Sequence, residues 1–336
     1  MNTFLTFNII FVSTVLALAL GPVAFWLAPK LGLVDNPNTA PHKVHQRSTP
    51  AVGGVIIVIT LLAVAFSTKN LLQPPIQAIM ISSLVVFAFG LWDDLHSLKP
   101  IWKFVGQLIA TILLIYLGVQ VQLFQQNWLN LALTVFWMVG VTNAYNFVDS
   151  MDGLAVGLAA LTSAFFLLIT LASQQDQISI FSTIMLGACL GVFYYNAPPA
   201  RIFLGDSGAQ LLGFILGALA IVYNPIGFSR LASWYIPILL MGVPIFDATL
   251  VVLSRLRRGK PVYQAGLDHT YHRLVKLGFS SNRAVLTMHL AALLLGSLAF
   301  VALELQPWLG NTIFIVVLLI GISIIIVLDS RQKALA

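Results

Sequence analysis

Long apolar runs alternate with short polar segments along the whole chain. A helix needs roughly 20 residues, with a range of 17–25, to cross a bilayer, and most of the runs reach that range. Because lipid cannot hydrogen-bond the backbone, each run is predicted to be an α-helix. The runs cover residues 4–27, 51–67, 76–92, 101–118, 128–147, 154–172, 179–195, 208–224, 232–254, 284–304 and 311–328. The pattern therefore predicts an all-α polytopic membrane protein with about 11 transmembrane helices.

The composition agrees with this reading. The 336 residues are 59% hydrophobic and 8% charged, and the mean hydropathy is +0.95. A soluble domain carries about 25% charged residues. The first run, 4–27, is too long for the apolar part of a signal peptide and follows no basic segment, so it is predicted to be a span. The chain is expected to form a single transmembrane domain over residues 1–336.

The basic residues mark one side of the membrane. Of the 17 Lys and Arg residues, all except Lys69 and Arg230 lie in or beside one alternating set of loops. The positive-inside rule makes this set cytoplasmic. An odd number of spans then places the N-terminus outside and the C-terminus in the cytoplasm. The basic pI of about 9.6 is explained by this topology, so no nucleic-acid partner is expected.

The polar chemistry gathers on the same side. Of the 11 acidic residues, only Asp176 and Glu304 fall on the outer side. The segments that carry the chemistry are 28–50, 93–103, 143–153, 196–208 and 255–283. Carboxylates, cations and Gly-rich turns at one membrane face indicate a site for a metal-bound, multiply charged phosphate ligand.

The stretch "WDDL" places two adjacent carboxylates, Asp93 and Asp94, at the end of a span. Two such groups repel each other, and a cation or a basic partner removes the penalty. Lys99 and Lys103 follow closely and are candidates for that partner. The alternative is a solvated helix end without a role.

The stretch "NAYNFVDSMDGL" spaces Asn143, Asn146, Asp149 and Asp152 three residues apart. This spacing turns successive side chains by about 60° on an ideal helix. Either the helix tightens toward three residues per turn, or it ends about Asp149 and the chain reverses near Gly153. Both arrangements bring Asn146 and Asp149 toward one ion, and oxygen ligands suit Mg²⁺. An Asn- and Asp-rich helix cap is the other interpretation.

The stretch "FLGDSGAQ" places Asp206 between Gly205 and Gly208 at the start of a span. Backbone amides at a helix N-terminus favour phosphate. An ordinary N-cap explains the same residues.

The stretch "DHTYHRL" places His269 and His272 one helical turn apart, beside Arg273 and the basic cluster 255–260. Zinc binding is one interpretation, but no cysteine lies nearby, and diphosphate binding fits the arginines better. The basic cluster alone would act as a membrane anchor. Asp247 is about 10 Å deep in its span, which indicates either a function or a structural partner such as Arg255.

Taken in order, five segments resemble the polyprenyl-phosphate N-acetylhexosamine-1-phosphate transferases of glycosyltransferase family 4. They are "HQRSTPAVGG", "GLWDDLHSLKPIWKFVGQ", "NAYNFVDSMDGLAVG", "NAPPARIFLGDSGA" and "DHTYHRL". The resemblance is strongest to the bacterial undecaprenyl-phosphate GlcNAc-1-phosphate transferases. It implies transfer of a sugar-1-phosphate from a UDP-N-acetylhexosamine to undecaprenyl phosphate. The reaction would start a cell-envelope glycan, such as lipopolysaccharide or teichoic acid, at the cytoplasmic face of the bacterial inner membrane.

The resemblance also implies roles for individual residues. Asn146 and Asp206 match the family's Mg²⁺ ligands, with Mn²⁺ left open as an alternative ion. The residues implied in catalysis are Asp93, Asp94, Lys103, Asp149, His269 and His272. The residues implied in substrate binding are Arg47, Asn143, Asp152, Asn196, Phe203 and Arg273, with Asn196 and Phe203 near the uracil ring.

One position departs from the family pattern. Many GlcNAc-type relatives have "HLHHRL", whereas here Tyr271 stands at the middle position. The stretch "VDNPNTAPHKVHQRSTPAVGG" still favours the GlcNAc branch over the phospho-MurNAc-pentapeptide transferases. A non-enzymatic transporter or lipid scramblase is the remaining alternative. It would need polar groups near mid-span, where the sequence offers only Asp247. Whether the chain forms a homodimer stays open.

Overall fold

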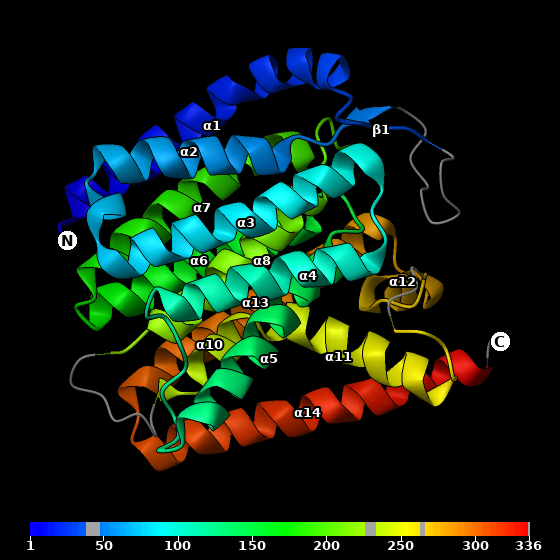
Figure 1. Ribbon diagram of the computed structural model, residues 1–336. Helices are drawn as coiled ribbons and strands as arrows, with labels where there is room; N and C mark the ends of the chain where they lie inside the picture. The colour runs from blue at the N-terminus through cyan, green and yellow to red at the C-terminus, as the bar shows by residue number, and fades with distance from the viewer. Residues whose placement is uncertain (38–47, 226–232, 263–265, 335–336) are drawn as a thin grey trace.

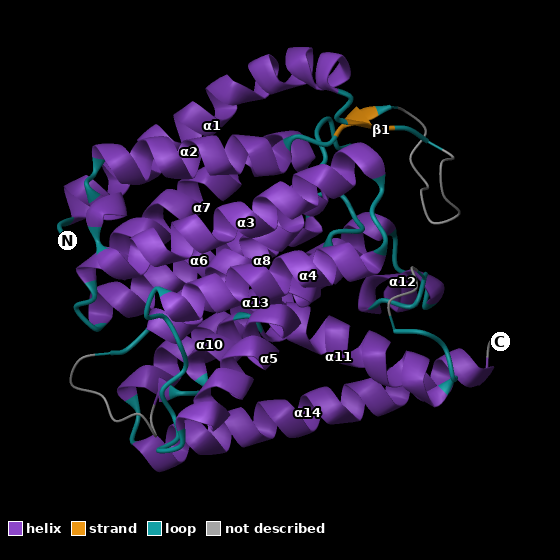
Figure 2. Cartoon of the chain, viewed as in Figure 1, coloured by secondary structure: helices purple, strands orange, loops and turns teal. Residues whose placement is uncertain are grey.

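The computed structural model describes residues 1–37, 48–225, 233–262 and 266–334. Helices lie side by side and make up nearly the whole of this part (Figures 1 and 2). The long helices are α1 (Thr3–Leu31), α2 (Gly53–Ser67), α3 (Pro74–His96), α4 (Pro100–Tyr116), α5 (Asn127–Val148), α6 (Leu154–Ala172), α7 (Asp176–Asn196), α8 (Gly205–Val222), α11 (Gly242–Arg257), α13 (Ser281–Glu304) and α14 (Pro307–Ala334). The short elements are β1 (Val34–Asp35), β2 (Thr49–Pro50), η1 (Asn70–Leu72), α10 (Ile236–Leu240) and α12 (Thr270–Lys276).

The helices follow the apolar runs of the sequence. Within the described residues, eight helices are long and apolar enough to cross a membrane, and α2 and α4 are shorter apolar helices. The all-helical, polytopic character is therefore confirmed, while the number of about 11 spans remains a prediction.

The ninth apolar run, 232–254, is not one continuous helix, which corrects the sequence-based expectation. α10 ends at Leu240 and α11 begins at Gly242. Pro244 lies in the first turn of α11, where it has no N–H for the carbonyl of Leu240. A proline inside a helix removes one backbone hydrogen bond and clashes with the preceding turn, so the break falls just before it.

Local signals explain where the helices begin and end. Asn2 accepts a hydrogen bond from the Leu5 amide and caps α1, and Ser280 caps α13 in the same way. α3 and α4 both start on a proline, which suits the first turn because its missing N–H would have no partner there.

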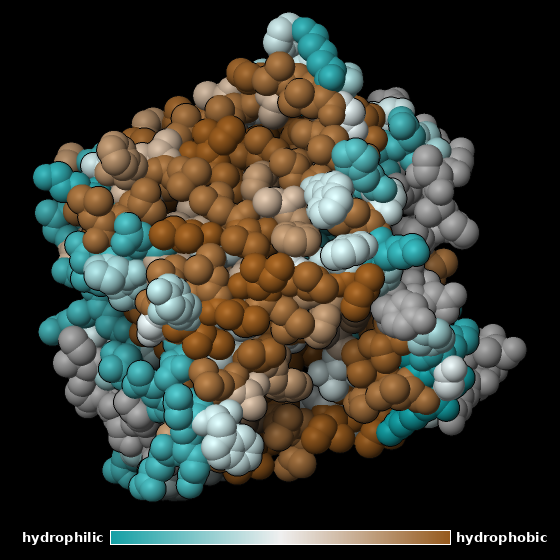
Figure 3. All heavy atoms as spheres, in the orientation of Figure 1, coloured by the Kyte–Doolittle hydropathy of each residue, from teal (hydrophilic) through white to brown (hydrophobic). Residues whose placement is uncertain are grey.

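The core is centred on α6, which packs against both α7 and α8. α7 packs against α6 and α1, and α8 packs against α3 and α5. α6 and α8 are the most deeply buried of the membrane-length helices, and α14 is the most exposed. Figure 3 shows the result on one face, where a broad apolar band lies between two polar ends. An exposed apolar band of this kind is what a membrane protein presents to lipid.

α2 crosses α8 closely near the first residues of both helices. A Cβ atom on Gly54 would lie 2.5 Å from the backbone nitrogen of Gly208, so the glycines let α2 and α8 touch. β1 and β2 pair antiparallel, with Val34 opposite Pro50. Ala51 then forms a parallel bridge with Phe203, just before α8. Segments far apart in sequence thus meet at the α8 N-terminus.

Candidate active site

Three charged side chains from three helices meet at one end of the bundle. The Lys103 ammonium lies 2.6 Å from Asp93 Oδ2 and 3.1 Å from Asp206 Oδ2. The exposed fractions of the three side chains are 23%, 8% and 29%, so the ion pairs are largely shielded from water. Of the two adjacent acids in "WDDL", Lys103 pairs with Asp93, and its second partner is Asp206.

The ends of α3 and α4 explain how Asp93 and Lys103 come together. Asp93 lies in the last turn of α3, and its Oδ1 accepts a hydrogen bond of 2.6 Å from the Leu98 amide. This bond closes the turn that leads to Pro100, where α4 begins. Lys103 therefore follows one turn into α4 and reaches back toward Asp93.

Asp94 has a different position from its neighbour. Its Oδ1 accepts a hydrogen bond of 2.7 Å from the Asp206 amide, and its Oδ2 accepts from the Ser207 amide and hydroxyl at 3.1 and 2.6 Å. Gly205, with φ of 74°, lets the carboxylate approach this closely, because a Cβ there would lie 2.7 Å from Asp94 Oδ2. Asp94 thus holds the α8 amides that the sequence offers to phosphate, and a phosphate would have to compete with it.

The α5 end brings amides and a further carboxylate to the site. α5 ends at Val148 and the chain reverses at Gly153, with φ of 75°, so the second of the two arrangements expected for this stretch holds. Asn146 lies in the last turn of α5 and Asp206 in the first turn of α8, and the two helices pack together. Burial raises the pKa of Asp149 well above its ordinary value, and the negative charge of Asp206 acts in the same direction.

The loop residues assigned to substrate binding hold neighbouring loops together. Asp152 Oδ2 accepts a hydrogen bond of 2.9 Å from the Ala200 amide. The buried Asn196 accepts from the Gly153 amide at 3.1 Å and donates to the Ile202 carbonyl at 2.9 Å. Phe203 donates its amide to the Pro50 carbonyl at 2.8 Å. These bonds bring the stretches around 50, 152 and 200 into one cluster. Arg47 lies outside the described residues.

Asp247 is paired with a histidine of the "DHTYHRL" segment. Its Oδ2 lies 2.9 Å from His269 Nδ1, and its Oδ1 accepts a hydrogen bond of 2.6 Å from the Thr270 amide. The expected structural partner, Arg255, instead forms a bidentate pair with Asp268 at 3.0 and 2.7 Å. Asp247 thus fixes the imidazole of His269 and the start of α12 from within α11.

Tyr271 attaches the same segment to the α5 end. Its side chain is fully buried, and its hydroxyl donates to Ser150 Oγ at 2.5 Å. The Tyr271 ring lies 4.1 Å from that of His272. Burial lowers the pKa of His272 to about 4, so this imidazole is neutral at pH 7. Tyr271 thus joins two segments of the site.

Arg273 is held by protein groups. It donates to the Asp268 carbonyl at 2.9 Å and to Ser254 Oγ at 2.8 Å, and one of its nitrogens lies 3.7 Å from Asp329 Oδ1. Its Nη1 is buried and has no hydrogen-bond partner within the described residues, whereas the other nitrogens would have to exchange a contact to bind a diphosphate. Sequence reasoning did not single out Asp268 or Asp329, because no local pattern shows that they face Arg273.

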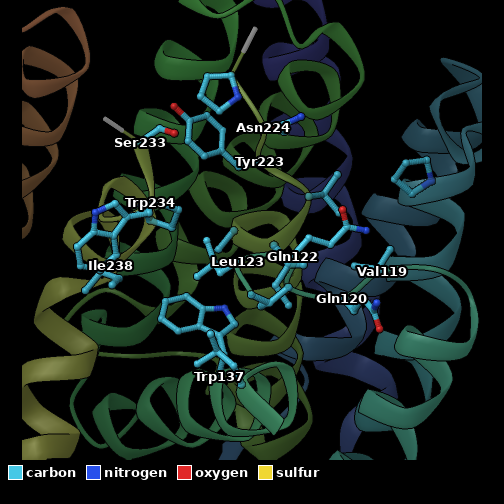
Figure 4. A pocket seen from close by; sticks show the side chains of 18 of the residues that line it. Val119, Gln120, Gln122, Leu123, Trp137, Tyr223, Asn224, Ser233, Trp234 and Ile238 are labelled. Atoms are coloured by element: carbon cyan, nitrogen blue, oxygen red, sulfur yellow. The ribbon is translucent and has the colours of Figure 1, made fainter. Parts of the chain in front are cut away.

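A cavity of about 450 Å³ opens at the opposite end of the bundle. Figure 4 shows Trp137, Tyr223 and Trp234 around it. None of its lining residues within the described parts of the chain is charged. It is separated from Asp206 by the length of α8, about 25 Å. The charged side chains therefore gather at the Lys103 end of the bundle and not around this cavity.

Comparison with known proteins identifies the family of the chain. The model of the family "Glycosyl transferase family 4" matches residues 76–224, which contain Asp93, Lys103 and Asp206. A protein of Bacillus subtilis (strain 168) named "Probable undecaprenyl-phosphate N-acetylglucosaminyl 1-phosphate transferase" is 31% identical, covering 92% of this chain and 87% of its own.

The names of two further relatives give a different lipid acceptor or a different sugar donor. A "Decaprenyl-phosphate N-acetylglucosaminephosphotransferase" of Mycobacterium tuberculosis (strain CDC 1551 / Oshkosh) is 30% identical, covering 81% of this chain and 76% of its own. A "Phospho-N-acetylmuramoyl-pentapeptide-transferase" of Halalkalibacterium halodurans is 27% identical, covering 88% of this chain and 96% of its own. With its apolar helices and these similarities, the chain is a multi-pass membrane protein that belongs to glycosyl transferase family 4, the family of the polyprenyl-phosphate N-acetylhexosamine-1-phosphate transferases.

Proposed function

We propose that the protein transfers GlcNAc-1-phosphate from UDP-GlcNAc to undecaprenyl phosphate. UMP is released, and the sugar-diphospho-lipid stays in the membrane. The names of the Bacillus and Mycobacterium relatives support a polyprenyl-phosphate acceptor and an N-acetylglucosamine donor.

The observation that carries the proposal is the position of Lys103 between Asp93 and Asp206. These residues come from α4, α3 and α8, and they meet at one polar end of the bundle. A cation held by two carboxylates is suited to a reaction in which phosphate oxygens approach and leave.

The charges of the substrates define what the residues must do. A phosphate monoester has its second pKa near 6, so the lipid phosphate is mostly dianionic at pH 7. One of its oxygens attacks the β-phosphorus of the UDP-sugar, the bond from that phosphorus to the UMP oxygen breaks, and UMP leaves. A strong general base is not required. The Lys103 ammonium reduces the repulsion between the two anions, and Asp93 orients that ammonium.

Asn146 and Asp206 are proposed to hold Mg²⁺. Across residues 1–37, 48–225, 233–262 and 266–334, no group of three or more His, Cys, Asp or Glu side chains is arranged to bind a metal. Mg²⁺ needs fewer protein ligands, because one or two carboxylates, waters and substrate phosphates complete its shell. The side chains of Asn146, at the end of α5, and Asp206, at the start of α8, offer an amide oxygen and a carboxylate as ligands. When bound there, the ion would neutralise the diphosphate and the charge that develops on UMP; Mn²⁺ accepts the same ligands.

The orientation in the membrane is proposed from the basic residues. α1 starts at the end of the bundle opposite to the one where α14 finishes (Figure 1), which suits an odd number of crossings. Eleven spans, with the interrupted α10–α11 segment as the ninth, place the N-terminus outside. The Lys103 site then faces the cytoplasm at the inner membrane of the bacterium.

The assay uses purified protein, undecaprenyl phosphate, Mg²⁺ and a panel of UDP-sugars, with release of UMP as the readout. We expect UMP with UDP-GlcNAc, and we expect Asp206→Ala to abolish it while the protein stays folded. Asp176→Ala is the matched control, because this carboxylate is exposed and pairs with the chain N-terminus. Near-normal UMP release by Asp206→Ala would remove this residue from the metal site.

A second donor is favoured by one observation, the similarity to the Halalkalibacterium pentapeptide transferase. The panel therefore includes UDP-MurNAc-pentapeptide, and release of UMP with this donor alone would replace UDP-GlcNAc in the proposal. No UMP with any donor would favour a transporter or a lipid scramblase.

A further inference from the structure

A layer of three amide side chains lies directly beneath the charged site. It consists of Gln107 on α4, Asn143 on α5 and Gln210 on α8. Each is three or four residues, one helical turn, from the residue that its helix contributes to the site: Lys103, Asn146 and Asp206 respectively. One turn is about 5 Å along the helix, so the two layers are adjacent.

Hydrogen bonds join the three amides across the helices. Gln107 Nε2 donates to Gln210 Oε1 at 3.0 Å, with a longer contact of 3.4 Å to Asn143 Oδ1. Asn143 Nδ2 in turn donates to Gln107 Oε1 at 2.7 Å. Gln107 is therefore the central member and uses both ends of its amide.

The burial of this layer is costly. Gln107 is 2% exposed and Gln210 is fully buried. Gln210 Nε2 has no hydrogen-bond partner within the described residues. Buried amides without full hydrogen bonding are unfavourable, and apolar side chains of similar size would fill the space without that cost. A layer that keeps three amides here is better explained by what it positions than by stability.

The packing of α4 shows what needs to be positioned. α4 packs mainly on α3 and α5, and its outer face is exposed. The exposed residues of α4 include Ile101, Trp102, Phe104, Ile109, Ile112 and Tyr116. A small rotation of such a helix would move Lys103 away from Asp206. One turn deeper than the Lys103–Asp206 pair, the hydrogen bond from Gln107 to Gln210 also joins α4 to α8.

We propose that Gln107 and Gln210 are positioning residues that fix the rotation of α4 against α8. They thereby hold the Lys103 ammonium between Asp93 and Asp206. The effect on catalysis rests on the proposed transfer reaction, whereas the effect on Lys103 itself does not. The sequence offers a signal for both glutamines, since each follows a candidate site residue by four positions.

The test compares Gln107→Leu, Gln210→Leu and the double variant with Thr111→Val. Thr111 is a matched control, because it is fully buried on α4 and its hydroxyl donates only to the Gln107 carbonyl of its own helix. We expect kcat for UMP release to fall about tenfold or more in each single variant, since a misplacement of about 1 Å can cost roughly 10²-fold. KM for the UDP-sugar should change less than about threefold, because Gln107 and Gln210 support the reacting groups and neither is assigned to substrate binding.

The double variant tests whether the glutamines act as a pair. Because they share one hydrogen bond, its loss of kcat should be close to that of the more affected single variant and not the product of both. A product of the two losses would contradict a shared role. If a leucine variant does not fold, Gln107→Met and Gln210→Met replace it with unbranched side chains of similar size.

A second readout is independent of turnover. Lys103 is acylated with an N-hydroxysuccinimide ester, and the rate is followed by mass spectrometry of its peptide. We expect labelling to become more than about threefold faster in the Gln107 and Gln210 variants and to stay unchanged in Thr111→Val, because an ammonium held by two carboxylates reacts slowly. If the unmodified protein releases no UMP, the proposed function fails and labelling alone decides this inference. Unchanged labelling in the glutamine variants, or an equal loss of kcat in Thr111→Val, would overturn it.

Discussion

Lys103 allows a direct test of how the site balances its charges. Lys103→Met keeps an unbranched apolar stem and removes an ammonium that lies 2.6 Å from Asp93 and 3.1 Å from Asp206. The two carboxylates then face each other without the cation that pairs with both. We expect a loss of stability that a divalent ion can partly restore.

The structure sets the magnitude. At an effective dielectric constant of about 20, two unit charges about 4 Å apart attract by roughly 4 kcal/mol. Removing one partner of a buried ion pair costs about 3–5 kcal/mol, and the limited exposure of the three side chains reduces this only modestly. For a chain of this size, such a loss lowers the melting temperature by roughly 5–10 °C. A ligand whose free concentration is about 100 times its Kd stabilises the folded protein by about 2.7 kcal/mol.

The assay is thermal unfolding of purified protein in detergent, first with a chelator and then with Mg²⁺. Lys103→Met should melt lower than wild type without metal, and Mg²⁺ should raise its melting temperature more than that of wild type. UMP release by Lys103→Met should be low even with Mg²⁺, since the proposed contact between the Lys103 ammonium and the substrate phosphates is lost. Lys99→Met is the control, because Lys99 is exposed at the start of α4. Equal melting temperatures without metal, or equal shifts with Mg²⁺, would refute the reasoning.

Three further predictions concern the parts around this site. Gly54→Ala should lower the melting temperature strongly, because the added Cβ would lie 2.5 Å from the α8 backbone. Gly140→Ala is the control and should not lower it, because no atom lies within 4 Å of its added Cβ. Equal melting temperatures of the two variants would contradict the close crossing of α2 and α8. Tyr271→Phe should reduce UMP release about 3- to 10-fold, the value of one hydrogen bond, and unchanged turnover would exclude a role for its hydroxyl. The lowered pKa of His272, about 4 against an ordinary 6.5, means that the unfolded chain binds more protons between these values. Stability should therefore fall as the pH drops from 6.5 to 4, and His272→Phe should flatten the slope of melting temperature against pH; an unchanged slope would assign the effect to other groups.

The sequence predicted the helices better than their contacts. Apolar runs and prolines located the long helices, since the requirement to hydrogen-bond the backbone in lipid leaves no other structure. The end of α5 at Val148 also followed from the spacing of polar residues and from Gly153. The break before Gly242 was missed because an apolar run remains apolar across it, although Pro244 was a visible signal.

For the site, too, the sequence indicated the residues better than their contacts. The spacing of carboxylates, amides and Lys103 indicated which residues would gather. It did not indicate that Asp94 would hold the α8 amides or that Asp247 would pair with His269. Those contacts depend on which helix ends lie next to each other. Hydrophobic periodicity reports which face of a helix is buried but not which helix covers it.

The charges of the site bear on the order in which ligands bind. Asp93, Asp94 and Asp206 contribute carboxylates at this end of the bundle, and Lys103 pairs with two of them. Burial raises the pKa of Asp149, and the charges of Asp206 and Asp94 act in the same direction, so this side chain favours its neutral form. The three other acidic side chains still outnumber the single ammonium, which favours a negative local field. A diphosphate that arrived without a counter-ion would meet this field and be repelled. The nucleotide sugar should therefore bind together with a divalent ion or after it, and binding of UDP-GlcNAc measured with a chelator present should be far weaker than with Mg²⁺.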